Sequence, residues 1–294
     1  LIRVPPDNPA STTEFVCDLC TEMPKPTDDG KTFTTFNSRD GLAGNQVNSI
    51  CQDRDGRLWF GTWGGLSRYS RADSSGRPRD TFTIFNSQDG LADDIVTGIS
   101  QDREGRLWFS TGGGVSRYDG QVFQTLTERD GLAYKNASST FQDREGTFWF
   151  STGNGLTRYR PSAPTPPQIF IDAVVADRRY EKVSDLAIPS TGGFTAFEFR
   201  AAMNFKTRPE AMVYRYRLKG YDQGWKNTHT RRVEYHDLPR GTYTFEVQAV
   251  DRDLVYSKTP ATVTLRVHLP YERLGLLSAL TVALALVAWQ TTRV

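Results

Sequence analysis

The chain has 294 residues, which predicts about two domains of ordinary size. Its 36 Lys and Arg residues nearly balance its 34 Asp and Glu residues, which excludes a strongly basic nucleic-acid-binding protein and an acidic tail protein. The 12% aromatic content and the 25 glycines favour short strands and tight turns over long helices. Three cysteines are too few to hold a chain of this length together, so its core must form by packing.

One motif occurs three times in the first half of the chain. The copies begin at Gln52, Gln101 and Gln142, and each reads Gln-Asp-Arg-Asp/Glu-Gly followed by Leu-Trp-Phe or Phe-Trp-Phe. Asp-Gly-Leu precedes each copy, and an Arg-Tyr pair follows it. A period of about 40–50 residues with several short strands per unit is typical of propeller blades. We therefore expect repeats near residues 31–70, 81–119 and 122–160.

Within the first copy, residues 47–52, 58–60, 66–69 and 82–85 are expected to form four strands. The Asp-Arg-Asp-Gly segment is expected to form a tight turn in which Gly supplies a positive φ, and the Trp of the second strand can fill the space between neighbouring blades. Calcium binding is the alternative for this segment. We prefer the turn, because a calcium loop needs more oxygen ligands and a distal Glu.

These motifs resemble the two-component regulator propeller repeat, in which Asp-x-x-Gly-x-Leu-Trp-x-Gly-Thr precedes a Gly-Leu-x-Arg-Tyr-like strand. Ser110 and Ser151 replace the Gly that follows the Trp strand in two copies. The resemblance implies an extracytoplasmic sensor region. Three repeats cannot close a propeller of about 4–8 blades, and residues 1–4 align with residues 66–69. We therefore expect residues 1–160 to be a partial propeller with three blades and part of a fourth, and the sequence to be a fragment with further blades upstream.

Residues 5–30 are expected to be a long insertion that carries Cys17 and Cys20. Outside the cytoplasm a local disulfide is the simplest interpretation of this pair. Unpaired thiols and a metal or redox role remain open, although a metal site usually has a second half-site. Cys51 occupies a strand position and is expected to be a small buried apolar residue.

Prolines at 161, 164, 166 and 167 predict a stiff linker over residues 161–167. Longer alternating strands follow, near residues 169–171, 194–199, 213–218, 243–250 and 261–267, with Gly-rich turns between them. This pattern predicts an immunoglobulin-like β-sandwich over residues 168–268. The tyrosines in it are expected to build the core rather than a ligand site.

Two segments of this region carry a second resemblance. Residues 214–222 read Tyr-Arg-Tyr-Arg-Leu-Lys-Gly-Tyr-Asp, and residues 235–245 contain Tyr, Leu-Pro, Gly, Tyr and Phe at matching spacings. Both resemble the Tyr-Tyr-Tyr domain, which in that family lies between the propeller and a membrane helix. Residues 269–271 depart from the aromatic stretch that is usual before the membrane in that family.

Residues 274–292 contain no charge and consist mostly of Leu, Ala and Val. About 20 such residues span a hydrocarbon core, and Trp289 lies where an interfacial anchor belongs. We expect one transmembrane helix there. A buried terminal helix is the alternative. The fold class is therefore all-β apart from this helix, with residues 1–273 in the periplasm and the chain anchored in a bacterial inner membrane.

Motifs for catalysis, phosphate binding and metal binding are missing from the sequence. No cofactor, metal or catalytic residue is predicted, and His229 and His236 are expected to be surface or strand residues. Recognition is more plausible, at the loops where the three copies differ, and Trp63 suits stacking on a sugar ring. Packing of Trp63 on the insertion is the alternative. The candidate ligand-binding residues are Asn45, Gln46, Trp63, Asp93, Asp94, Tyr134, Lys135 and Asn136.

The sequence favours the sensor region of a membrane-bound two-component regulator. A small molecule or oligosaccharide would bind it, and the β-sandwich would relay the signal to a cytoplasmic histidine kinase absent from this chain. The parent receptor is expected to be a homodimer, and no nucleic acid is expected as a partner of this portion. The alternatives are a membrane-anchored carbohydrate-binding or adhesion protein and, less favoured, a propeller enzyme such as a glycan lyase.

Overall fold

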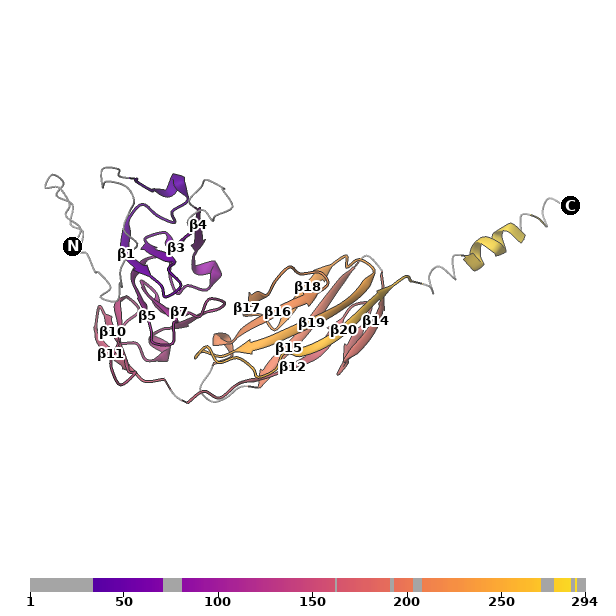
Figure 1. The fold of residues 1–294 in the computed structure, drawn as a ribbon. Coiled ribbons are helices and arrows are strands. Elements are labelled where there is room, and N and C mark those ends of the chain that lie inside the picture. Colours follow the sequence, from indigo (N-terminus) through magenta and orange to yellow (C-terminus); the bar gives the residue numbers. More distant parts are fainter. Residues whose placement is uncertain are drawn as a thin grey trace. The chain divides into compact units, whose positions relative to one another are not determined.

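The computed structural model describes residues 34–70, 81–161, 163–190, 193–202, 208–270, 278–286 and 289 (Figure 1). The chain forms two compact units, Leu1–Ala163 and Pro164–Val294, which meet in the proline-rich segment. The expected all-β fold is confirmed, since nearly all regular structure in the described ranges is strand. Each unit is described below by itself.

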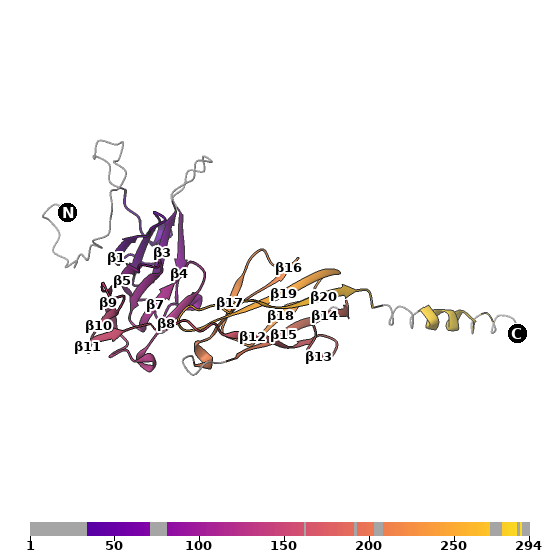
Figure 2. The same cartoon turned by 60° about the horizontal axis from the view of Figure 1, so that its bottom comes forward.

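Three successive antiparallel sheets form the first unit, and Figure 2 shows their strands side by side. The first repeat sheet has the order β1-β2-β3-β4, the second β5-β6-β7-β8, and the third β9-β10-β11. A short 3₁₀ turn precedes the first strand of each sheet. The elements are η1 (Ser38–Asp40), β1 (Val47–Gln52), β2 (Leu58–Thr62), β3 (Gly65–Ser70), β4 (Thr81–Phe85), η2 (Ser87–Asp89), β5 (Val96–Gln101), β6 (Leu107–Thr111), β7 (Gly114–Tyr118), β8 (Phe123–Leu126), η3 (Glu128–Asp130), β9 (Ala137–Gln142), β10 (Phe148–Thr152) and β11 (Gly155–Tyr159).

The repeated Asp-Arg-Asp/Glu-Gly segment is a hairpin turn held by its first aspartate. In the first copy, Asp53 Oδ1 accepts hydrogen bonds from the backbone N–H groups of Asp55 and Arg57, at 3.0 and 2.8 Å. Gly56 takes a φ of 80°, which a residue with a Cβ adopts only with strain. The turn prediction is confirmed in all three copies, because Asp102 and Asp143 make the same contacts. The described residues contain no group of three or more acidic, His or Cys side chains arranged for a metal.

The other oxygen of the same aspartate positions the tryptophan of the following strand. Asp53 Oδ2 accepts a hydrogen bond from the Trp59 indole at 2.8 Å, and Asp102 accepts one from Trp108 at 2.9 Å. Both indoles are almost completely buried. A buried indole N–H without a partner is costly, so the aspartate lets a large polar-tipped ring lie in the core.

These tryptophans pack between neighbouring sheets, as the sequence predicted. Trp59 lies 6.0 Å from both Phe109 and Tyr118 of the second sheet, measured between ring centroids. Trp108 lies 4.3 Å from Phe148 of the third sheet. The Arg of the Arg-Tyr pair covers the tryptophan of its own sheet, with Arg117 5.3 Å from the Trp108 ring.

The second unit contains two facing sheets with the orders β13-β12-β15-β18 and β14-β20-β19-β16-β17. All pairs are antiparallel except β14 with β20, which the sequence did not suggest. Buried Phe197 and Phe245 stack across the core with centroids 4.0 Å apart. The strands and turn are β12 (Gln168–Val175), β13 (Arg179–Glu181), β14 (Asp185–Pro189), β15 (Phe194–Ala202), η4 (Pro209–Ala211), β16 (Val213–Lys219), β17 (Lys226–Thr228), β18 (Arg232–His236), β19 (Gly241–Val250) and β20 (Ala261–His268).

Several sequence predictions fall outside the described residues. These are the insertion at 5–30 with Cys17 and Cys20, and nine of the 19 residues of the predicted membrane span at 274–292. Residues 278–286 are helical, and no helix in the described part of the chain has the length and apolar character needed to cross a membrane. Cys51 is buried, as predicted.

We expect Asp102→Ala to weaken the repeat unit more than Asp143→Ala. Both changes remove the turn cap, but Trp108 is fully buried whereas Trp149 is half-buried and can be hydrated when its acceptor is lost. The expected loss is about 2–3 kcal/mol for Asp102→Ala, and the loss for Asp143→Ala should be clearly smaller. Native-state hydrogen exchange of the β6 and β10 amides measures both. Equal losses of stability in the two variants would show that burial of the indole does not determine how much stability is lost.

Candidate functional site

The candidate residues of each repeat lie at one edge of its sheet, where the loop before the first strand meets the turn after the second. In the first repeat the Trp63 amide donates a hydrogen bond to the Gln46 carbonyl at 3.3 Å. The Gly153 amide donates in the same way to Asn136 in the third repeat, at 3.1 Å. The structure therefore brings together the two loops of each repeat that the sequence analysis selected.

Some of the residues that differ between the three copies stabilise their own loops. Asn45 Oδ1 accepts a hydrogen bond from the Ser38 amide at 2.8 Å, and Asp94 makes the equivalent contact with Ser87 at 2.7 Å. The third copy has Lys135 at this position, which cannot accept. There the direction reverses, and the Lys135 amide donates to Glu128 Oε1 at 3.1 Å. The side chains of Asn45 and Asp94 thus brace their own loops.

Asp93 is also used locally, since its Oδ1 accepts from the Ile95 amide at 2.8 Å. A Cβ at Gly112 would lie 3.0 Å from this oxygen, so the facing turn has little room for a side chain. Ile95 itself is 41% exposed. Sequence reasoning passed over it, and its place between the variable Asp94 and the first strand is the signal that could have found it.

The candidates with the most exposed surface are aromatic. Trp63 is 57% exposed on the β2–β3 turn. Tyr134 is 40% exposed and lies beside the β10–β11 turn, where a Cβ at Gly153 would come within 3.3 Å of its ring. An exposed ring beside backbone amides and short polar side chains can stack on the apolar face of a sugar while its hydroxyls find hydrogen-bond partners.

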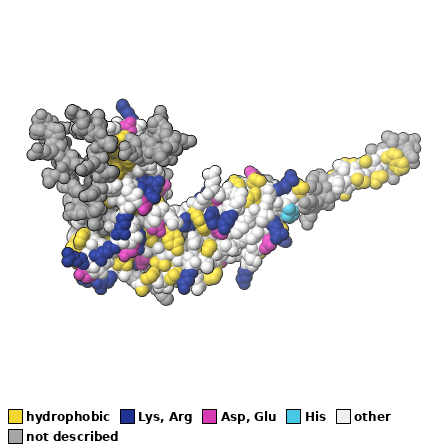
Figure 3. Space-filling view, viewed as in Figure 1, with side chains coloured by type: hydrophobic (Ala, Val, Ile, Leu, Met, Phe, Trp, Pro, Cys, Tyr) yellow, Lys and Arg dark blue, Asp and Glu magenta, His cyan; other side chains and the backbone are white. Residues whose placement is uncertain are grey.

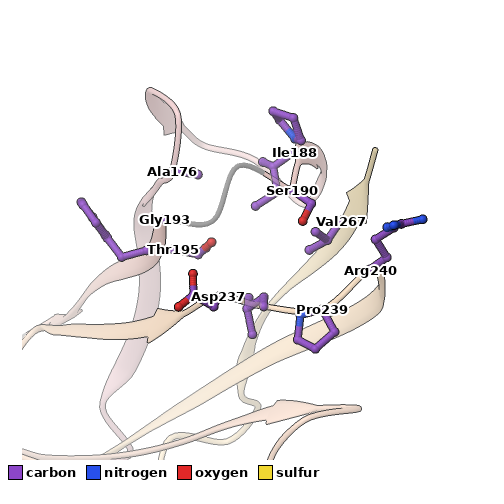
Figure 4. A pocket seen from close by; sticks show the side chains of 12 residues that line it. Ala176, Ile188, Ser190, Gly193, Thr195, Asp237, Pro239, Arg240 and Val267 are labelled. Atoms are coloured by element: carbon purple, nitrogen blue, oxygen red, sulfur yellow. The ribbon is translucent and has the colours of Figure 1, made fainter. Parts of the chain in front are cut away.

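A pocket of about 250 Å³ lies at one end of the sandwich, a feature the sequence did not indicate. Figure 4 shows Ser190 and Thr195 contributing hydroxyls and Ile188 and Val267 contributing apolar surface. The turn that carries Asp237 closes one side of the pocket. The Asp237 amide donates a hydrogen bond to the Gly193 carbonyl at 3.0 Å. The lining combines apolar groups and hydroxyls with the charged side chains of Asp237 and Arg240.

A buried carboxylate, Asp222, is surrounded by a cluster of charged and polar partners in the sandwich. Its side chain is only 2% exposed; Oδ2 accepts from the Tyr235 hydroxyl at 2.6 Å and the Leu218 amide at 2.7 Å, while Oδ1 pairs with Lys226 at 2.6 Å. Burial acts to raise the pKa of Asp222, but these hydrogen bonds outweigh it and the pKa is lowered. Burial and the contact with Asp222 raise the pKa of Tyr235, so this tyrosine is a fixed donor.

Three tyrosines of this region have the structural roles that were predicted, whereas Tyr221 is 47% exposed. Tyr214, Tyr235 and Tyr243 are at least 94% buried. The Tyr243 hydroxyl donates to the Pro239 carbonyl at 2.8 Å and fixes the β18–β19 corner. His229 contacts the Met212 carbonyl, and His236 lies exposed on β18.

Comparison with protein families accounts for parts of both units. Residues 41–64 and 90–113 match the two component regulator propeller. Residues 206–268 match the Y_Y_Y domain. The chain thus carries two component regulator propeller repeats followed by a Y_Y_Y domain. No curated protein sequence matches it significantly.

Several solved structures are similar to the chain. One is the extracellular domain of BT3049 from B. thetaiotaomicron, named as a hybrid two component system, with 21% identity over 79% of this chain and 33% of that one, and a TM-score of 0.42. Another is the extracellular domain of BT4673 from the same organism, named as a one component system, with 17% identity over 81% of this chain and 38% of that one, and a TM-score of 0.33. PorZ, of the type-IX secretion system of Porphyromonas gingivalis, shares 14% identity over 76% of this chain and 30% of its own, with a TM-score of 0.32. The chain spans about a third of the length of these structures.

The lowered pKa of Asp222 predicts an acid-sensitive sandwich. A carboxylate with a lowered folded-state pKa stabilises the fold above its ordinary value of 3.8, and this stabilisation is lost as the pH falls through the folded-state pKa. We expect Asp222→Asn to lower the urea midpoint of the sandwich at pH 7 and to flatten its dependence on pH below about 4.

The matched control is Asp185→Asn, which removes the exposed ion pair with Arg266. We expect it to leave the midpoint nearly unchanged, because exposed pairs contribute little. An Asp222→Asn variant whose midpoint still falls in acid as steeply as that of the unchanged protein would assign the acid sensitivity to other carboxylates.

Proposed function

We propose that this chain is the extracytoplasmic sensor region of a membrane-bound two-component regulator. The observation that carries the proposal is the presence, in one chain and in this order, of two component regulator propeller repeats and a Y_Y_Y domain. The role assigned to this chain is recognition without chemical conversion.

The ligand of the proposed sensor is an oligosaccharide or another small polar molecule. It binds at the edge where the loops before the first strands meet the turns after the second strands. Trp63 and Tyr134 provide exposed rings there, and Lys135 and Asn136 provide polar groups beside them. Gln46 and Asn45 complete the first loop and Asp93 and Asp94 the second.

Anchoring is assigned to residues 274–292. Residues 278–286 of this segment are helical, and their Leu and Val side chains are between 55% and 61% exposed. Figure 3 shows apolar side chains along this helix. Exposed apolar residues on all sides of a helix are unfavourable in water and suit a lipid environment. In this proposal, the signal passes from the repeats through the proline-rich segment and the sandwich to the membrane and then to a histidine kinase.

The mechanism imposes one thermodynamic condition. A ligand shifts a two-state receptor only if it binds the two states with different affinity. In the proposal, the states differ in how the units or the copies of the receptor are arranged, and the proline-rich joint transmits the difference.

The second candidate function is a membrane-anchored carbohydrate-binding or adhesion protein without signalling output. The exposed Trp63 and Tyr134 fit this function equally well, because stacking on a sugar does not require a relay.

We expect Trp63→Ala to weaken binding of the oligosaccharide that a glycan array identifies. Loss of one stacking ring costs about 1 kcal/mol, or roughly fivefold in affinity. Titration calorimetry measures the change. Phe170→Ala, which removes a ring that is 42% exposed in the sandwich, is the matched control and should leave affinity unchanged. Equal affinities for both variants and the original protein would remove Trp63 from the site.

The coding sequence beyond Val294 distinguishes the two functions. A sensor requires a helix with a phosphorylatable histidine followed by an ATP-binding domain, and kinase output from the intact receptor should change when the ligand is added. A stop codon after the apolar segment would contradict signalling and favour the adhesion protein.

A further inference from the structure

The pocket at the end of the sandwich is bounded by both sheets and by the corner between β18 and β19. Ile188 of β14 and Val267 of β20 come from one sheet, and Thr195 of β15 comes from the other. Asp237 lies on the corner and closes a third side. A molecule in the pocket therefore touches three parts of the sandwich that are distant in the sequence.

Thr195 places a hydroxyl where the rest of its strand places apolar side chains. Successive side chains of a strand alternate between its two faces, and Phe197, Phe199 and Ala201 share the inner face of β15 with Thr195 and belong to the core. Thr195 is only 5% exposed, and its hydroxyl makes no hydrogen bond among the described residues. Figure 4 shows this hydroxyl directed into the pocket. Because a buried hydroxyl without a partner is unfavourable, a polar group of a bound molecule would satisfy it.

Asp237 adds a carboxylate on a corner whose backbone is fixed. Its amide donates to the Gly193 carbonyl at 3.0 Å, and the Tyr243 hydroxyl donates to the Pro239 carbonyl at 2.8 Å. The Asp237 side chain is exposed and has neither an ion pair nor a hydrogen bond among the described residues. The half-buried hydroxyl of Ser190 also has no hydrogen-bond partner there. The lining thus offers three oxygen groups that the fold leaves available, and one of them is charged.

The rest of the lining decides which kind of donor fits these oxygen groups. Ile188, Leu238 and Val267 are buried and apolar. Figure 4 shows the Arg240 side chain directed away from Asp237, and no ion pair joins these two described residues. Among the residues that the structure describes, no group of three or more acidic, His or Cys side chains is arranged for a metal. A ligand with a single positive charge and an apolar body is therefore the best match.

We propose that this pocket binds the ammonium group of a small aliphatic amine. An ammonium group carries three N–H donors and one positive charge, which matches the three oxygen groups and the one carboxylate. Asp237 pairs with the charge, the hydroxyls of Thr195 and Ser190 accept the remaining hydrogen bonds, and the aliphatic chain lies against Ile188 and Val267. The site is separate from the loop edge of the repeats, and the proposal does not depend on the proposed function.

Methyl NMR of the full chain in mild detergent tests the site, with n-butylamine at pH 7 as the probe. We expect a saturable shift of the Ile188 methyl signal as butylamine is added. The methyl signal of Ile99, which packs in the second repeat sheet, is the internal control and should not move. The neutral analogue 1-butanol should bind roughly threefold to fivefold more weakly, because it lacks the charge that pairs with Asp237.

The Asp237→Asn variant tests the carboxylate. Asn has nearly the same size and tolerates the positive φ of 49° at this position, so the corner should keep its shape. We expect butylamine affinity to fall roughly threefold to fivefold and 1-butanol affinity to stay the same. Asp185→Asn removes an exposed carboxylate of β14 that does not line the pocket, and this matched control should bind butylamine normally.

The Thr195→Val variant separates binding from folding. Valine has the shape of threonine without the hydroxyl. Because the Thr195 hydroxyl has no partner among the described residues, the urea midpoint of the sandwich should stay the same or rise. Butylamine affinity should fall about fivefold, since one hydrogen bond to the ammonium group is lost. A hydroxyl with a purely structural role would give the opposite pattern, a lower midpoint and unchanged affinity.

Three further results would overturn the proposal. An Ile188 methyl signal that does not respond to butylamine would show that the pocket binds no amine. Equal affinities for butylamine and 1-butanol in the original protein would show that the positive charge is not recognised. Equal butylamine affinities in the Asp237→Asn and Asp185→Asn variants would remove Asp237 from the site.

Discussion

The hydrogen bond from an indole to a turn aspartate is the interaction on which the repeat unit depends. One carboxylate does two tasks in each repeat: one oxygen caps the hairpin and the other accepts from the tryptophan of the next strand. The first task shapes the turn, and the second fixes where a large ring enters the space between two sheets. Because turn and packing share one side chain, local structure and tertiary packing form together. Where the ring is less buried, the same hydrogen bond from Trp149 lowers the pKa of Asp143.

The sandwich uses a similar device with different residues. Asp222 holds the hydroxyl of Tyr235, the backbone at Leu218 and the ammonium of Lys226 around one buried carboxylate. Glu246 is held in a comparable way by Arg217 and Lys219, and its pKa is lowered because these partners outweigh burial. In both units, acidic residues that a search for catalysis would select are engaged in structure. The proposed recognition site therefore relies on exposed aromatic rings and loop amides.

The variable loops show which functional residues a comparison of the three repeats can and cannot identify. Differences among Asn45, Asp94 and Lys135 suggested recognition, yet the first two brace their loops and Glu128 compensates for the third. Trp63 and Tyr134 remain exposed and carry the binding proposal. A sequence cannot separate these cases, because a brace and a ligand contact both use short polar side chains at loop positions.

The strands and turns of the repeats, five strands of the sandwich and the order of the two β regions follow from the sequence alone, because period, turn glycines and the Trp and Tyr positions are local properties of the chain. The short strands β13, β14, β17 and β18 were not predicted. The sequence also indicated that Trp59 and Trp108 lie between sheets and that the sandwich tyrosines are structural. The parallel pairing of β14 with β20, the pocket beside Asp237 and the exposure of Ile95 at the candidate edge become visible only in the three-dimensional fold. These features depend on residues that are distant in sequence, and they leave no periodic pattern in the chain.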